Sequence, residues 1–92
     1  MATFVTKKDG TRTPYDAEKI KHGVSQAALE AELADSEASK VAEVISASLA
    51  STFESVEEVS TQELREKILS ELDATHPAVA ESWRKYEEGK HE

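Results

Sequence analysis

The chain has 92 residues, no cysteine and a formal net charge of −8 from 11 basic and 19 acidic side chains. This length suits a single domain, residues 1–92, and the lack of cysteine excludes a disulfide framework, a thiolate nucleophile and a cysteine-based zinc site. No apolar run has the length of a signal peptide or a membrane span, so we expect a cytoplasmic protein with no membrane partner. The negative charge argues against nucleic acid as a partner, because phosphate attracts clustered Lys and Arg.

Charge is distributed unevenly along the chain. Residues 1–22 carry five basic and three acidic side chains, a net charge of +2, whereas residues 23–92 carry 6 basic and 16 acidic ones, a net charge of −10. This asymmetry is typical of a local anion-binding site on an acidic body, although it also arises by chance in so short a chain.

Residues 3–14 are predicted to form a β-hairpin. The first strand is rich in β-branched and aromatic residues, with Phe4 and Val5 as candidates for burial. Asp9-Gly10 is a strong turn signal, because glycine accepts the positive φ that tight hairpins need. We expect strand pairing to end at Pro14, which has no N–H to donate.

A first helix is predicted over about residues 16–33. Asp16 is a suitable N-cap, and Tyr15 and Ile20 have the spacing of a hydrophobic staple around it. The apolar stripe of this helix, at helical period, comprises Ile20, Val24, Ala27 and Ala28.

A second helix is predicted over about residues 36–52, with Asp35-Ser36 as its start and cap. Its expected buried stripe comprises Val41, Val44, Ile45 and Leu49. The helical pattern then stops, and residues 55–59 are a candidate third strand.

Two further helices are predicted over about residues 61–73 and 77–88. Ser60 and Glu63 have the spacing of a capping box, and Pro77 suits the first position of a helix. Their apolar stripes comprise Leu64, Ile68, Leu69 and Leu72, then Val79, Ala80, Trp83 and Tyr86. The fold class is therefore α+β and mostly helical: a four-helix bundle capped by a small three-stranded β-sheet.

The sequence contains no catalytic motif that we recognise. There is no HExxH, no GxSxG and no Walker loop, and His22, His76 and His91 share no metal-ligand spacing. We therefore expect neither a catalytic residue nor a metal ligand, and a protein that is not an enzyme.

An anion site is the stronger functional signal. Lys7 and Lys8 end the first strand, Lys19 lies in the first turn of the first helix, and Thr61 opens the third helix. A helix N-terminus offers free N–H groups and a positive dipole end to an anion. The alternative is that the lysines form a solvated surface and Thr61 supports the cap. Trp83 and Tyr86 similarly fit either core packing or stacking on a base.

Four segments in order resemble the ATP-cone domain family. Phe4–Gly10 and Tyr15–Ile20 are similar to its opening strand, Lys-Arg-Asp-Gly turn and aromatic-Asp-x-x-Lys-Ile helix start, with Lys8 where arginine is common. Val59–Leu64 resembles its V-x-T-x-x-I segment, and Val79–Tyr86 its V-A-x-x-Y-x-x-Y segment. The resemblance implies a nucleotide-sensing module of the kind found at the N-terminus of ribonucleotide reductases or behind a zinc ribbon in repressors of reductase genes.

The resemblance also implies a ligand and a site. ATP or dATP would bind between the β cap and the bundle, at Val5, Lys7, Lys8, Tyr15, Asp16, Lys19, Ile20 and Thr61. The lysines and Thr61 would lie near phosphate. Tyr15, Asp16 and Ile20 would lie near adenine, with the Asp16 carboxylate as an acceptor for its amino group. Magnesium would arrive with the nucleotide, since the sequence shows no carboxylate cage for it.

Regulation through assembly is the activity that the resemblance implies, with a second copy or a larger enzyme as the partner. The chain then reads as a stand-alone ATP-cone, a relative that has lost nucleotide binding, or an excised domain. The alternatives in function are an interaction module of the same fold and a component of a transcriptional regulator.

Overall fold

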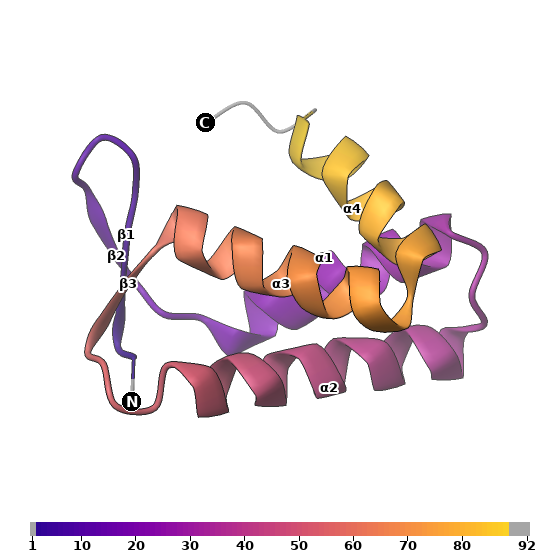
Figure 1. The fold of residues 1–92 in the computed structure, drawn as a ribbon, viewed down its shortest axis with the longest axis horizontal. Coiled ribbons are helices and arrows are strands. Elements are labelled where there is room, and N and C mark those ends of the chain that lie inside the picture. Colours follow the sequence, from indigo (N-terminus) through magenta and orange to yellow (C-terminus); the bar gives the residue numbers. More distant parts are fainter. Residues whose placement is uncertain (1, 89–92) are drawn as a thin grey trace.

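The structure is a computed structural model, which describes the backbone of residues 2–88 and the side chains of residues 2–85. Its elements, in chain order, are β1 (Phe4–Thr6), β2 (Arg12–Pro14), α1 (Ala17–Glu30), α2 (Asp35–Thr52), β3 (Glu58–Ser60), α3 (Thr61–Thr75) and α4 (Pro77–Glu88). The predicted α+β class is confirmed: a helical bundle carries a small sheet at one end (Figure 1).

The sheet has the strand order β2-β1-β3. β1 pairs antiparallel with β2, placing Val5 opposite Thr13, and parallel with β3, placing Val5 opposite Val59. Val59 is 1% exposed, whereas Phe4 is 40% exposed. Because side chains alternate along a strand, one sheet face meets the helices and the other faces solvent, so the expected burial of Phe4 is wrong.

The hairpin forms as the Asp9-Gly10 signal predicts. Gly10 adopts a φ of +89°, and the Lys7 N–H donates to the Thr11 carbonyl at 2.8 Å. The strand ends at Pro14, as expected, and one more backbone hydrogen bond follows it, from the Tyr15 N–H to the Thr3 carbonyl at 2.9 Å. The N–H that proline lacks would have pointed to the free edge of the sheet, so its absence removes no hydrogen bond between β1 and β2.

The first helix is shorter than predicted. α1 ends at Glu30 because Glu32 adopts a φ of +70°, with its N–H donating to the Leu29 carbonyl. The Leu33 N–H in turn donates to the Ala28 carbonyl at 3.1 Å. This pair of bonds is the Schellman arrangement that terminates helices.

The predicted cap of the second helix is wrong. α2 begins at Asp35 with Ala34 at the N-cap, and no side chain caps it. Asp35 therefore occupies the first helical position, where its charge still favours the positive end of the helix dipole. The Ser60–Glu63 capping box of α3 is confirmed, with both reciprocal hydrogen bonds at 3.0 Å.

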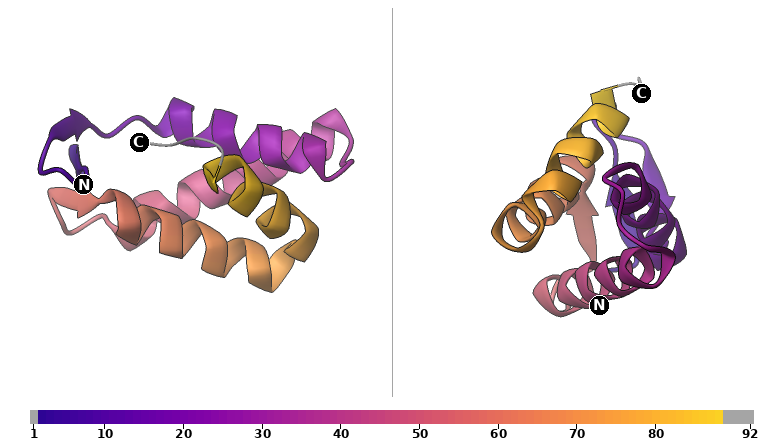
Figure 2. Two further views of the ribbon diagram at one scale, coloured as in Figure 1. Left: turned by 90° about the horizontal axis from the view of Figure 1, so that it is seen from above. Right: turned by 90° about the vertical axis from the view of Figure 1, so that its right-hand side faces the viewer.

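The core lies between the helices, each of which packs beside two others: α1 on α2 and α4, and α3 on α2 and α4 (Figure 2). Its largest fully buried side chains are Ile45, Leu49, Leu72, Val24, Val59 and Val79. Trp83, 6% exposed, belongs to this core, so its role is core packing. The side chain of Tyr86 lies outside the described part.

Val44 is 58% exposed, which corrects its predicted burial. Neighbouring helical positions point about 100° apart, and Ile45 takes the inward direction.

Candidate nucleotide-binding site

The eight predicted site residues all belong to segments at the sheet end of the molecule. α1 and α3 both begin beside the sheet, whereas the α1–α2 connection lies at the far end (Figure 1). Val5, Lys7 and Lys8 belong to β1 and the hairpin turn. Tyr15 and Asp16 lie between β2 and α1, and Lys19 and Ile20 lie on α1. Thr61 is the first residue of α3. Segments far apart in sequence therefore converge at this end.

The start of α3 is tied directly to β1. Thr6 lies opposite Ser60 in the parallel pair, and the Thr61 hydroxyl donates to the Thr6 carbonyl at 3.3 Å. Lys7 follows Thr6, so its backbone lies beside the first turn of α3. Val5 is half-buried on the face of the sheet that meets the helices. The sheet thus brings Val5, Lys7 and Thr61 to one place.

The start of α1 is capped by the chain itself. Asp16 Oδ1 accepts from the backbone N–H groups of Glu18 and Lys19 at 3.1 and 3.2 Å. These two N–H groups are not free, which corrects the expectation that the helix start offers them to an anion. One carboxylate oxygen of Asp16 makes the cap, which leaves Oδ2 as the acceptor available to a ligand.

The positive charge of the candidate site therefore comes from its cationic side chains rather than from the start of α1. Lys8 and Lys19 are exposed, and neither forms an ion pair with another residue in the described part of the chain. Lys7 is half-buried at the end of β1. The pKa of Asp9, in the same turn, is lowered mainly by the Thr11 backbone N–H and only slightly by Lys7. No described hydrogen bond or ion pair joins Lys8 to α1 or to α3.

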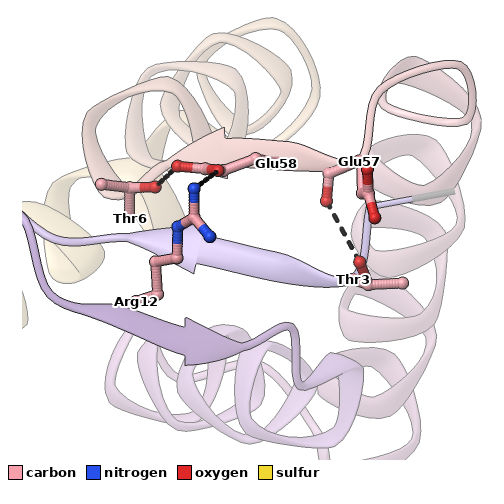
Figure 3. A network of polar contacts seen from close by, with 5 residues as sticks. All are labelled: Thr3, Thr6, Arg12, Glu57 and Glu58. Carbon is pink, nitrogen blue, oxygen red and sulfur yellow. Dashed lines mark hydrogen bonds and ion pairs between the residues drawn. The ribbon is translucent and has the colours of Figure 1, made fainter.

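Arg12, unlike Lys8 and Lys19, has an ion-pair partner in the described part of the chain. Its guanidinium lies 3.1 Å from Glu58 Oε1 and 5.9 Å from the centre of the Phe4 ring. The Thr6 hydroxyl also donates to Glu58, so the three strands share one polar network on the outer face (Figure 3). Arg12, although part of the basic N-terminal segment, is thus neutralised on the face opposite Val5.

Tyr15 joins the hairpin to α1, and Tyr15 and Ile20 each pack against the core. Its hydroxyl oxygen is buried and has no hydrogen-bond partner within the described region. Burial raises the pKa of Tyr15 above its ordinary value. The half-buried ring and the buried hydroxyl lie next to the capped start of α1.

Arg65 is a candidate that the sequence reasoning missed. It lies four residues after Thr61 on α3, so both residues occupy one face of the helix, and its side chain is half-buried. The i, i+4 spacing from Thr61 is the signal that could have identified it. Arg65 already has an interaction partner, so a phosphate would compete for its guanidinium.

Elsewhere on the described surface, the groups that a ligand could contact are fewer. An open groove between α1 and α2 is lined by Glu18, Lys21, His22, Ser25, Ser39, Ala42 and Glu43, and Lys21 there pairs with Glu18 at 3.6 Å. Among the described side chains, those of residues 2–85, no three acidic or histidine groups are placed to bind a metal ion. No helix within residues 2–88 is long and apolar enough to cross a membrane.

Comparison with known proteins supplies the family. None of the curated proteins compared with the chain is significantly similar to it. The sequence does match the family described as the ATP cone domain, over residues 3–92. This match includes the hairpin, all four helices and every residue of the candidate site, so the chain belongs to the ATP-cone domain family.

Proposed function

We propose that this chain is a non-catalytic regulatory domain that binds ATP or dATP at the sheet end of the bundle. ATP-cone domains are nucleotide-sensing regulatory domains that bind adenine nucleotides. The observation that carries the proposal is the exposure of Lys8, in the hairpin, and Lys19, on α1, neither of which has an ion-pair partner among the described side chains of residues 2–85. A triphosphate would supply the missing opposite charge.

The proposed arrangement divides the ligand between two environments. The triphosphate lies near Lys7, Lys8 and Lys19, with the Thr61 hydroxyl at the start of α3. The base lies near Tyr15 and Ile20, with the free oxygen of Asp16 as the acceptor for the adenine amino group. Magnesium accompanies the nucleotide, because the described residues offer no carboxylate cage for it.

The regulatory output that we propose is a change in assembly. Nucleotide binding would control association of the domain with a second copy or with a larger enzyme of the ribonucleotide reductase kind. A chain without cysteine that responds to adenine nucleotides suits the cytoplasm. Light scattering with ATP, with dATP and without nucleotide tests this output, and an unchanged mass for the chain alone would point to the larger enzyme.

Two charge-matched variants test the site. Lys19→Gln and Arg12→Gln each remove one positive charge from the basic N-terminal segment. We expect Lys19→Gln to weaken ATP binding by about ten- to a hundredfold, the usual worth of a hydrogen bond to a charged group. Arg12→Gln should leave the affinity within about twofold, because Arg12 pairs with Glu58 on the outer face of the sheet. Titration calorimetry measures both.

Equal losses in the two variants would contradict this site and indicate attraction by overall charge alone. Full affinity in Lys19→Gln would remove Lys19 from the site. If the wild-type protein binds neither ATP nor dATP, the alternative gains support: an interaction module of the same fold without a nucleotide. Salt-dependent binding to duplex DNA would favour a regulator of transcription instead, against the net charge of −8.

A further inference from the structure

Tyr15 has an orientation that packing alone does not explain. It follows β2 and precedes the Asp16 cap, and its backbone N–H donates to the Thr3 carbonyl at 2.9 Å. Its ring packs against the core, which a phenylalanine would do equally well. The hydroxyl is therefore the only part of the side chain without a structural role.

That hydroxyl is buried where a tyrosine usually exposes it. Tyrosine is amphipathic, so a half-buried ring normally keeps its polar tip in water or against a partner. Here the residue as a whole is half-buried, yet the hydroxyl oxygen is fully covered and bonds to no described group. A buried polar group without a partner destabilises the protein that carries it. The ligand-free domain thus bears a cost that a ligand could remove.

We propose that the Tyr15 hydroxyl hydrogen-bonds the base or ribose of the bound adenine nucleotide. Entry of the nucleotide displaces the side chains that cover the hydroxyl and gives it a partner. The nucleoside half is the part concerned, because a neutral phenol in an apolar setting suits a neutral ligand group, whereas the charged triphosphate suits the exposed Lys8 and Lys19. This inference rests on the proposed function and assigns to Tyr15 a role in affinity.

Tyr15→Phe tests the proposal, because it removes only the hydroxyl. The ligand-free variant should melt at the same temperature as the wild type or higher, since the unsatisfied group is gone. Its Kd for ATP should rise by about three- to tenfold, the usual worth of one neutral hydrogen bond. Any melting shift caused by inorganic tripolyphosphate should be the same size in both proteins, because the phosphates do not contact the hydroxyl.

Ser48→Ala is the matched control. The Ser48 hydroxyl, on α2, donates to Glu71 Oε1 at 2.7 Å and so has a structural partner. Its removal should lower the melting temperature and leave the Kd for ATP unchanged, which is the opposite of the result expected for Tyr15→Phe.

The outcomes separate the two proposals. If the wild type binds ATP and Tyr15→Phe binds it equally well, the inference is overturned and the proposed function stands. If the wild type binds neither nucleotide, the proposed function fails, and this inference fails with it. A lower melting temperature for ligand-free Tyr15→Phe would show that the hydroxyl is structural and would also overturn the inference. So would a smaller tripolyphosphate shift in the variant, because the hydroxyl would then act on phosphate.

Discussion

At the scale of single residues, the basic side chains of residues 1–22 differ in whether they have an ion-pair partner. Arg12 is held on the outer face of the sheet by Glu58, and Lys21 pairs with Glu18 on α1. Lys8 and Lys19 have no such partner among the residues that the structure describes. The net charge of +2 over residues 1–22 is therefore not a uniform patch. Lys8 and Lys19, which have no ion-pair partner in the described part, are two of the three lysines that we propose for the triphosphate.

The buried Tyr15 hydroxyl predicts how stability depends on pH in the alkaline range. Burial raises the pKa of Tyr15 in the folded state above its ordinary value near 10. The unfolded state then loses this proton first, so the contribution of Tyr15 to stability is complete below pH 10 and is lost as pH rises through the folded pKa. Urea unfolding between pH 8 and pH 11 should show a decline that is steeper in the wild type than in Tyr15→Phe.

The two proteins differ only in the Tyr15 hydroxyl, so the difference between the two curves reports on that group. Coincident slopes above pH 10 would mean that the Tyr15 hydroxyl is solvated rather than buried.

At the scale of the elements, the helix ends show how closely each boundary follows its local sequence. The N-cap residues of α1 and α3, Asp16 and Ser60, cap their helices with side chains, whereas the N-cap residue of α2, Ala34, has no side chain that can do so. Alanine leaves the first N–H groups of α2 without a side-chain acceptor. The start of α2 is therefore the place where one substitution can add a missing interaction.

Ala34→Ser should stabilise the domain. Ala34 already has the extended backbone of an N-cap, with φ −66° and ψ 155°, so a serine hydroxyl can accept from the first turn without a change in the chain. The gain should be about 1 kcal/mol, measured by urea or thermal unfolding. Ala50→Ser, at an exposed position inside α2, is the control and should be neutral or slightly destabilising. An equal gain in both variants would rule out capping as the cause.

The predictions that succeeded from the sequence depend on neighbours along the chain. Asp9-Gly10 forms the turn, Asp16 caps α1, and Ser60 with Glu63 makes the capping box. The failures depend on the third dimension. The solvent exposure of Val44 is set by the way α2 packs, and Arg12 is paired with Glu58, a residue on a strand far away in sequence.

The candidate site likewise has some features that follow from the local sequence and others that follow from the fold. Its lysines and Tyr15 could be named from the resemblance to the family, because they stand in short motifs. The unsatisfied hydroxyl of Tyr15 could not, because its burial follows from the folded geometry. Arg65 could have been predicted from its i, i+4 spacing to Thr61, because α3 begins at Thr61.

At the scale of the whole molecule, a small acidic bundle carries a basic hairpin at one end. Residues 23–92 have a net charge of −10, so they repel free nucleotide at long range. Magnesium and salt reduce this repulsion, while the contacts that we propose between the triphosphate and the lysines would act over a few ångströms and be screened less. The domain also lacks a large core, so a ligand that binds only the folded state should raise its stability measurably, by about 2.7 kcal/mol at a hundredfold excess over Kd.

Titration calorimetry of the wild-type chain with ATP and with dATP, at fixed magnesium, tests the central claim most directly. We expect saturable binding of at least one of the two nucleotides, together with a higher melting temperature of the same samples. No heat of binding and no shift in melting at millimolar concentrations of either nucleotide would contradict the claim that this member of the ATP-cone family senses adenine nucleotides.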